Sequence, residues 1–143
     1  MLPIVLAADH AGFRLKEKVK SHLAANGYLV VDFGTDSEQP ADYPDFIRPA
    51  AESVARGDCA LGIVFGGSGN GEAMAANKVR GIRCAVCWNE QSARLAKEHN
   101  NANIISLGAR MITEEEGTAI VDAWLNAEFL GGRHQRRIEK IER

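Results

Sequence analysis

The sequence has few cysteines, little net charge and no long apolar run. The three cysteines, Cys59, Cys84 and Cys87, are an odd number in 143 residues. This is far below the density of a secreted disulfide scaffold and is typical of a reducing compartment. No apolar stretch approaches the roughly 20 residues that cross a bilayer, and no basic segment precedes the short apolar run at the N-terminus. We therefore expect a cytoplasmic protein that makes no membrane contact.

The net charge of −2 at pH 7 argues against a nucleic-acid partner, because such proteins usually carry a broad basic surface that neutralises phosphates. The hydrophobic fraction of 45% and the charged fraction of 25% are ordinary for globular proteins. The length suits one folded unit, so we expect a single domain over residues 1–143.

Cys84 and Cys87 have the C-x-x-C spacing of some redox and zinc sites. They lie in an apolar run that is typical of a strand, where the two thiols point to opposite faces. A redox pair prefers a helix N-terminus, and a zinc site needs a second ligand pair. We therefore expect buried, unreactive thiols. The histidines show no metal-binding spacing either, so we expect no metal ligand set.

Short apolar runs alternate with helical patterns along the chain. The runs at 4–8, 29–33, 61–65, 84–88 and 104–107 predict five buried strands. Between them, apolar residues recur at helical spacing, and Thr113 with Glu116 forms a capping-box pattern that predicts a helix beginning at Glu114. This alternation requires parallel strands joined by right-handed crossovers. The predicted fold is α/β, a Rossmann-like three-layer α/β/α sandwich with a five-stranded parallel sheet.

Polar residues follow three of the predicted strands. Asp9 and His10 follow the first strand, a glycine-rich loop at 66–71 follows the third, and Arg110 follows the fifth. Ligands of such sheets bind beyond the carboxyl ends of the strands, near the point where strand order reverses. We therefore expect the three clusters to converge on one edge of the sheet.

The glycine-rich loop joins a strand to a predicted helix and carries four glycines in six residues, at Gly66, Gly67, Gly69 and Gly71. Without side chains, the backbone amides can form a nest of donors at the positive end of the helix. An anion is the natural occupant of such a nest. It could be a phosphate, or a negative charge that develops only during a reaction.

Two better-known glycine motifs fit less well. A Walker A loop needs a lysine directly after its last glycine, and Glu72 occupies that place. A dinucleotide fingerprint needs G-x-G-x-x-G and an acidic residue about 20 positions on. The loop has G-x-G-x-G instead, although Glu90 stands at a suitable position. A non-catalytic nucleotide-binding module therefore stays open as an alternative.

Glu72 would repel a phosphate bound by the loop. Its position makes better sense if a carboxylate removes a proton from carbon while the loop stabilises the resulting oxyanion. This pairing indicates enolisation, as in aldose–ketose exchange, where the C2 proton leaves, an enediolate forms and the proton returns at C1. The alternative is that Glu72 only occupies the favourable first turn of a helix.

Basic residues gather near the C-terminus. The segment 131–143 predicts a helix with Arg133 and Arg137 four residues apart on one face, and His134 is a third donor. An anion such as a sugar phosphate would satisfy both guanidinium groups. Alternatively, the helix is solvated and its arginines pair with Glu139 or Glu142.

His99 and Asn100 lie between a predicted helix and the next strand. They could belong to a site, or they could be cap residues, because a single histidine in a loop is more often structural than catalytic.

These motifs together resemble the type B ribose 5-phosphate isomerases, whose family also contains galactose 6-phosphate isomerase subunits and allose 6-phosphate isomerases. The resemblance is carried by AADHAGFRLK (7–16), DYPDF (42–46), GGSGNGEAMAANKVRGIRCA (66–85), EHNNANI (98–104) and GRHQRRI (132–138). It covers essentially the whole chain. Several separate motifs in the right order are more specific than any one of them.

The resemblance implies catalytic roles at matched positions. In one branch of the family a cysteine at the position of Gly66 is the base, and in the other the base is a glutamate at the position of Glu72. This sequence has the glutamate and lacks the cysteine. By the same resemblance, Ser68 would shuttle a proton between the substrate oxygens, and Asp9 and His99 would open the sugar ring.

Other matched positions imply contacts with the substrate. The loop amides would hold the enediolate, Asn100 would hold a hydroxyl, and the phosphate would contact arginines of the C-terminal helix rather than the glycine loop. The implied binding residues are His10, Tyr43, Gly67, Gly69, Asn70, Gly71, Asn100, Arg110, Arg133, His134 and Arg137.

Members of this family are dimers whose active sites take residues from both subunits, with the C-terminal helix reaching the neighbour. The resemblance therefore implies a homodimer or a tetramer, a helix at about 132–142 that reaches a partner, and no cofactor. The expected substrate is ribose 5-phosphate. A six-carbon 6-phosphate of the allose or galactose type is the alternative, and a partner subunit of a heteromer is a further one.

Overall fold

The computed structural model describes residues 1–143, which form five strands and six helices. The strands are β1 (Ile4–Ala8), β2 (Val30–Asp32), β3 (Leu61–Gly66), β4 (Cys84–Val86) and β5 (Ile104–Gly108). The helices are α1 (Phe13–Ala25), α2 (Pro44–Ala55), α3 (Asn70–Asn77), α4 (Glu90–Asn100), α5 (Glu114–Asn126) and α6 (Arg133–Ile141). All strands are parallel, in the order β2-β1-β3-β5-β4.

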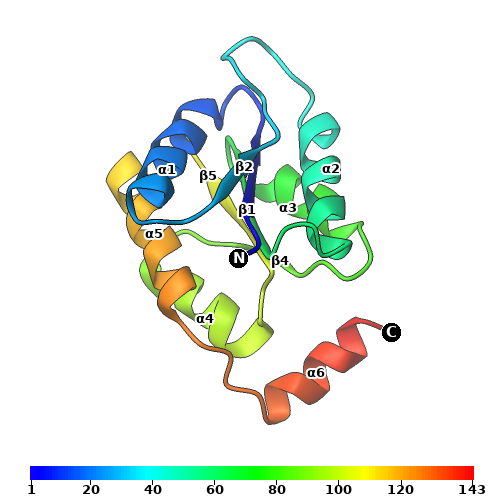
Figure 1. The fold of residues 1–143 in the computed structure, drawn as a ribbon. Helices are drawn as coiled ribbons and strands as arrows, with labels where there is room; N and C mark the ends of the chain where they lie inside the picture. Colours follow the sequence, from blue (N-terminus) through cyan, green and yellow to red (C-terminus); the bar gives the residue numbers. More distant parts are fainter.

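Helices cover both faces of the sheet. Helices α1, α4 and α5 lie on one face, and α2 and α3 lie on the other (Figure 1). Each face has its own apolar cluster, one around Leu6, Phe65 and Trp124 and the other around Val5 and Ile47. Neighbouring residues of β1 enter opposite clusters, as strand alternation requires. The predicted three-layer α/β sandwich with a five-stranded parallel sheet is confirmed.

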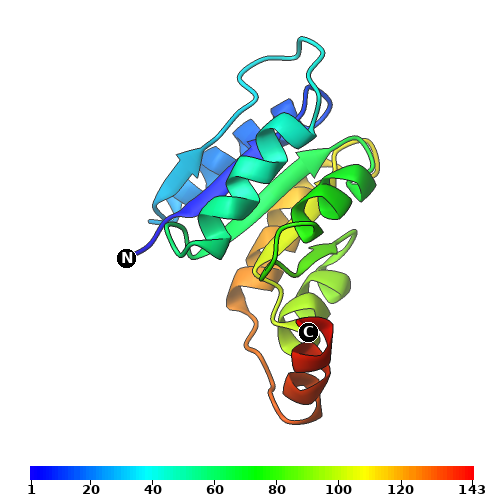
Figure 2. The same cartoon turned by 90° about the vertical axis from the view of Figure 1, so that its right-hand side faces the viewer.

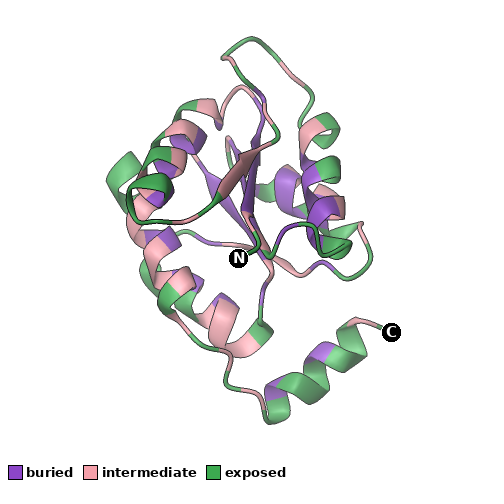
Figure 3. Ribbon diagram, viewed as in Figure 1, coloured by how far each residue is buried: buried purple, intermediate pink, exposed green.

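All five predicted strands are present, but their burial differs. β1 and β5 are completely buried, and β3 is buried from its second residue onward. The prediction of burial is wrong for β2 and β4, which are half-buried and shorter than predicted (Figure 3). Both are edge strands, so only one side of each is covered by a neighbouring strand.

The helix that was predicted to begin at Glu114 begins there. The Glu116 amide donates to Thr113 Oγ1 over 3.0 Å, and the Thr113 amide donates to Glu116 Oε1 over 2.9 Å. Asn89 and Ser92 form a second capping box at α4. None of the six helices combines the length and apolar character needed to cross a bilayer.

The thiols of Cys84 and Cys87 lie on opposite faces of the sheet, as predicted. Cys87 belongs to the cluster under α1, α4 and α5, whereas Cys84 packs against the cluster under α2 and α3. Burial raises the pKa of Cys87 to about 12 and also raises the pKa of Cys84. Both thiols are therefore protonated and unreactive at neutral pH.

Lys16 is fully buried and ties α1 to β2. Its Nζ lies 2.6 Å from Asp32 Oδ2 and 3.4 Å from Glu17 Oε2, and Lys20 Nζ lies 3.0 Å from the same Asp32 oxygen. Burial alone would raise the pKa of Asp32, but hydrogen bonds from Lys16, the Gly34 amide and Lys20 outweigh it and hold that pKa below its ordinary value. Asp32 is thus the nearer of the two carboxylates that lie beside the buried ammonium group.

Replacing Asp32 with asparagine should lower the free energy of unfolding by about 3 kcal/mol, because it leaves a buried lysine without its nearest counter-charge. Urea denaturation at a fixed protein concentration measures the change. The folded-state pKa of Asp32 lies below its unfolded value, so its contribution is present above roughly pH 4 and is lost as the pH falls further.

The matched control is Glu17→Gln, which removes a carboxylate that is 43% exposed and 3.4 Å from the same lysine. Its cost should stay below about 1 kcal/mol. Equal costs for the two variants would contradict the assigned role of Asp32.

Candidate active site

The polar clusters that follow β1, β3 and β5 lie on one edge of the sheet. These three strands are neighbours in the sheet. Strand β2 lies on one side of β1 and β3 lies on the other, so the strand order reverses between β1 and β3. The Ala109 amide donates to the Gly66 carbonyl over 2.7 Å, and the Arg110 amide donates to the Gly67 carbonyl over 3.0 Å. The predicted convergence at a topological switch point is confirmed.

The glycine-rich loop enters α3 through a left-handed residue. Gly69 is the N-cap of α3 at φ 86°, and a β-carbon built there would lie 3.1 Å from Ser106 Oγ and 3.2 Å from the Gly108 amide nitrogen. Ser106 is completely buried and donates from Oγ to the Gly69 carbonyl over 2.7 Å. Sequence reasoning missed this residue, although a serine inside an apolar strand is a usable signal.

The loop presents backbone donors that have no partner within the chain. The amides of Gly67, Ser68 and Gly71 make no hydrogen bond to other protein groups, whereas the Asn70 amide donates to Ser68 Oγ over 3.2 Å. These donors stand at the N-terminus of α3, where the helix dipole favours negative charge. The loop can therefore accept an anion or an oxyanion.

Arg110 and Tyr43 flank this loop at close range. A β-carbon built on Gly67 would lie 3.1 Å from Arg110 Nη1, and one built on Gly71 would lie 2.8 Å from the Tyr43 hydroxyl oxygen. A side chain at Gly71 would clash with Tyr43, and one at Gly67 would crowd the Arg110 guanidinium group. A guanidinium group and a phenol therefore lie against opposite parts of the loop, where each can donate to a bound anion.

Glu72 lies in the first turn of α3 and is 3% exposed. A β-carbon built on Gly66 would fall on the Glu72 carboxyl group. A side chain at position 66 and this carboxyl group therefore compete for the same space. The two alternative base positions that the resemblance implied thus meet at one point in the fold.

The pKa of Glu72 is raised, chiefly by burial and further by the nearby carboxylate of Asp9, while hydrogen bonds from the amides of Glu72 itself and Gly69 oppose the rise. Asp9 is buried too, and its Oδ1 accepts from the Gly12 amide over 3.0 Å. A β-carbon at Gly12 would clash with the Phe65 backbone, so α1 begins directly against the end of β3. This close packing brings the two carboxyl groups together.

His10 lines a cavity that Glu72 does not line. Its Nδ1 accepts from the Ala41 amide over 3.1 Å, so a neutral His10 carries its proton on Nε2 and can donate from there. The cavity, of about 440 Å³, also contains Asp42 and Asp45. These carboxylates make the cavity a poor phosphate site by itself.

Two of the implied site residues lie at the other end of the sheet. His99 and Asn100 are the last residues of α4, just before β5, whereas the glycine-rich loop meets the end of β5. The length of β5 alone separates the two ends by about 13 Å. One chain therefore does not bring His99 and Asn100 to Glu72.

Helix α6 lies at the same end as His99, beyond the body of the sandwich (Figure 2). The His99 and His134 rings stack with centroids 4.3 Å apart and planes 12° apart. The pKa of His134 is lowered by burial and by the positive charges of His99, Arg133 and Arg137. These side chains form a cationic cluster.

Arg133 and Arg137 are exposed and form no ion pair. The alternative in which they pair with Glu139 or Glu142 is wrong, because Glu139 accepts from Gln135 Nε2 and Glu142 binds another arginine, Arg83. The arginines are therefore available to an anion from outside the chain.

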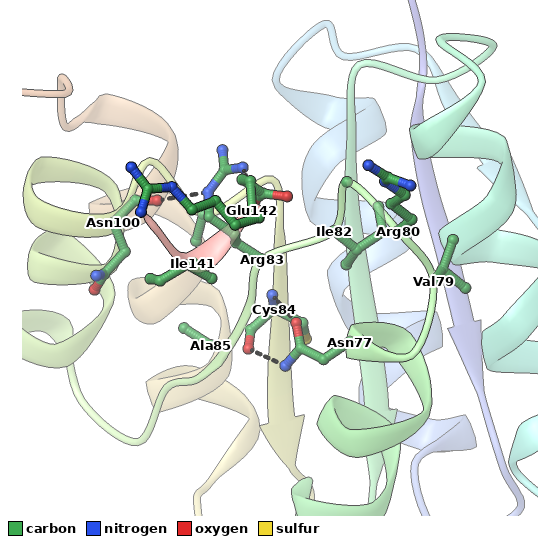
Figure 4. A pocket seen from close by; sticks show the side chains of 13 residues that line it. Asn77, Val79, Arg80, Ile82, Arg83, Cys84, Ala85, Asn100, Ile141 and Glu142 are labelled. Atoms are coloured by element: carbon green, nitrogen blue, oxygen red, sulfur yellow. Dashed lines mark hydrogen bonds and ion pairs between the residues drawn. The ribbon is translucent and has the colours of Figure 1, made fainter. Parts of the chain in front are cut away.

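A cavity of about 640 Å³ separates α6 from the segment between α3 and β4 (Figure 4). Val79, Ile82, Cys84 and Ile141 give it apolar walls, and Asn100 lines it as well. Glu72 does not line this cavity. The end of the sheet that carries the cationic cluster therefore also has a partly apolar cavity.

The arrangement gives no support to a nucleotide site. Glu90, which stood at a suitable position for a dinucleotide fingerprint, begins α4 after the edge strand β4. Strand β5 lies between β4 and the strand that carries the glycine-rich loop. An acidic residue that contacts a ribose should follow a strand next to the loop.

Comparison with known proteins gives one consistent result. The ribose-5-phosphate isomerase B of Mycolicibacterium paratuberculosis is 48% identical over 138 residues, which cover 95% of this chain and 87% of that protein. The structure of Clostridium thermocellum ribose-5-phosphate isomerase B matches with a TM-score of 0.97 and 48% identity, over 99% of this chain and 95% of the other.

The Mycoplasma genitalium ribose-5-phosphate isomerase B, solved with bound ribulose-5-phosphate, matches with a TM-score of 0.94 and 44% identity, over 99% of this chain and 94% of the other. The family model described as Ribose/Galactose Isomerase matches residues 4–141. The chain therefore belongs to the ribose/galactose isomerase family.

Proposed function

We propose that the protein interconverts ribose 5-phosphate and ribulose 5-phosphate through an enediolate, with Glu72 as the base. One observation carries the proposal. The buried Glu72 carboxyl group lies beside amides of the glycine-rich loop that have no hydrogen-bond partner within the chain. Relatives of similar length carry the name ribose-5-phosphate isomerase B, and one was solved with ribulose-5-phosphate bound.

The proposed reaction moves one proton from carbon to carbon. The Glu72 carboxylate takes the C2 proton of the open-chain aldose, and the charge moves to the C1 oxygen as the enediolate forms. Ser68 then passes a proton between the two substrate oxygens, and Glu72 returns its proton to C1, which leaves the carbonyl at C2. The amides of Gly67, Ser68 and Gly71 stabilise the oxyanion, and each such donor is typically worth about 3 kcal/mol.

The raised pKa of Glu72 suits this task. Burial and Asp9 make its carboxylate a stronger base than an exposed glutamate, so it takes a proton from carbon more readily. The amides of Glu72 and Gly69 oppose the rise in pKa, because hydrogen bonds to the carboxylate favour its ionised form.

The remaining roles are those that the family resemblance implies for the matched positions. We infer that Asp9 and His99 open the sugar ring and that Asn100 holds a hydroxyl. Tyr43, Gly69 and Asn70 shape the loop side of the site. The phosphate is bound by His10, Arg110, Arg133 and Arg137, with His134 beside them.

We also infer a homodimer with shared active sites. The Glu72 group and the cationic cluster of one chain lie at opposite ends of β5, which is itself about 13 Å long, so one chain does not bring both groups to the same sugar. In a two-fold dimer, the cluster of one subunit can lie over the glycine-rich loop of the other, and both sites are then complete. Each chain acts as one domain over residues 1–143.

The first test is Glu72→Gln, which keeps the size of the side chain and removes its basicity. Turnover of ribose 5-phosphate should fall by at least about 10³-fold, because a positioned general base contributes roughly that much. Calorimetry should still detect sugar-phosphate binding. Near-normal kcat in this variant would show that the base is elsewhere.

The six-carbon alternative is tested with the wild-type protein. We expect kcat/KM for ribose 5-phosphate to exceed that for allose and galactose 6-phosphates by at least about tenfold, which is within the reach of one extra carbon unit. A higher kcat/KM for either six-carbon sugar would reassign the substrate without changing the base.

The next test measures the pH dependence of kcat/KM. Because Glu72 must be ionised to act as a base, kcat/KM should fall as the pH falls through a pKa above the ordinary value of 4.5. Asp9→Asn removes a like charge and should move this acidic limb to lower pH, in addition to any loss of rate. The exposed Asp58→Asn is the control and should leave the limb in place. An unmoved limb in Asp9→Asn would exclude Asp9 as a cause of the raised pKa.

The last test asks whether active sites are shared between subunits. Two inactive variants, Glu72→Gln and Arg133→Ala/Arg137→Ala, are combined by co-expression. In a mixed dimer with shared sites, one site carries both defects and the other is intact. Random pairing should therefore restore about one quarter of wild-type activity. Activity no higher than that of the separate variants would mean that each site belongs to one chain.

A further inference from the structure

Arg83 joins two segments beside the cationic cluster that are far apart in the sequence. Its Nη2 donates to the Asn101 carbonyl over 2.9 Å. Its Nε donates to the Asn100 carbonyl over 2.9 Å, and its Nη1 lies 2.7 Å from Glu142 Oε1 (Figure 4). The Arg83 side chain is only 19% exposed. One guanidinium group thus bridges the end of α4 and the end of α6.

The first two acceptors are carbonyls at the C-terminus of α4. Such carbonyls lack partners within the helix, and they carry the negative end of the helix dipole. Asn101 is the C-cap and has a left-handed conformation, with φ 43°. A cation at this place stabilises the turn that presents His99 and Asn100.

The backbone of Arg83 is itself held in place. Its amide donates to Asn103 Oδ1 over 2.8 Å, and its carbonyl accepts from the Asn103 amide over 3.2 Å. Because the guanidinium is planar and presents several donors in a fixed geometry, it can fix both groups of acceptors relative to β4. A lysine has one ammonium group and cannot reach all three acceptors at once.

Helix α6 has few other contacts that fix its orientation. It follows Gly131 and Gly132, both with positive φ values of 69° and 58°, and only His134 and Ile138 are buried (Figure 3). The His99–His134 stack holds the start of α6. The ion pair between Arg83 and Glu142 is the contact at the opposite end.

We propose that Arg83 is a positioning residue for substrate binding, which holds α4 and α6 so that Asn100, Arg133 and Arg137 meet the sugar phosphate together. It acts through these residues and does not itself contact the reacting carbons. The inference rests on the proposed function, because it assigns those three residues to the substrate.

The central experiment compares Arg83→Gln with the wild-type protein. KM for ribose 5-phosphate should rise about tenfold while kcat falls by a smaller factor, because the Glu72 end of the site is untouched and His99 is the one catalytic residue on the turn that Arg83 holds. Calorimetric binding of inorganic phosphate should weaken by a similar factor. Phosphate binding gives a readout that does not depend on turnover.

Two further variants separate positioning from general stability. Glu142→Gln keeps the contacts to α4 and should raise KM about threefold, since only the anchor of α6 is lost. Arg56→Gln removes an exposed arginine that pairs with Glu52 and Asp58 and makes no ion pair with α4 or α6, and should leave KM unchanged. Melting temperatures and oligomer size are measured for all variants.

Non-additivity is the sharpest readout. In the Arg137→Ala background, Arg83→Gln should raise KM by much less than tenfold, because part of what Arg83 positions is already absent. The same factor in both backgrounds would overturn the proposal, as would a fall in kcat at unchanged KM, which indicates fewer folded molecules.

The two proposals fail in different ways. A wild-type protein that does not isomerise ribose 5-phosphate refutes the proposed function, and phosphate binding then tests Arg83 alone. A wild-type protein that does isomerise it, together with unchanged KM and phosphate affinity in Arg83→Gln, refutes the positioning role.

Discussion

Close backbone approach at the carboxyl ends of β1, β3 and β5 is the constraint on which the site depends. The Glu72 carboxyl group occupies the space that a side chain at Gly66 would need, Arg110 lies against Gly67, and Tyr43 lies against Gly71. A side chain at Gly66 or Gly71 would displace Glu72 or Tyr43, and one at Gly67 would crowd Arg110. The glycines therefore serve the packing of these three side chains as much as the conformation of the loop.

Burial of Glu72 and the distance to the arginines act together. A carboxylate removed from water is a stronger base, but a cation beside it would cancel the effect by lowering its pKa. Within one chain, the exposed Arg133 and Arg137 lie at the opposite end of β5 from Glu72. This separation within one chain keeps the two guanidinium groups away from the Glu72 carboxylate.

Much of the fold was predictable because its signals are local. The strand at 4–8 and the helix beginning at Glu114 follow from an apolar run and from a capping box within four residues. The half-burial of β2 and β4 was not predicted, because their runs are mostly apolar, with Asp32 as the one charged residue, and the strand order is what makes them edges. Ser106 was missed for a similar reason, since its partner Gly69 is 37 residues away.

The sequence by itself determined the alternation of strands and helices, the glycine-rich loop with a carboxylate at the start of a helix, and the opposite orientation of Cys84 and Cys87. Only the tertiary structure decided that Asp9 lies close enough to raise the pKa of Glu72, and that Glu142 pairs with Arg83 and not with an arginine of its own helix. Backbone periodicity and helix caps act over a few residues, so they can be read along the chain. Contacts between charges 59 or 63 residues apart depend on which strands are neighbours and where a helix docks, and no local pattern records that.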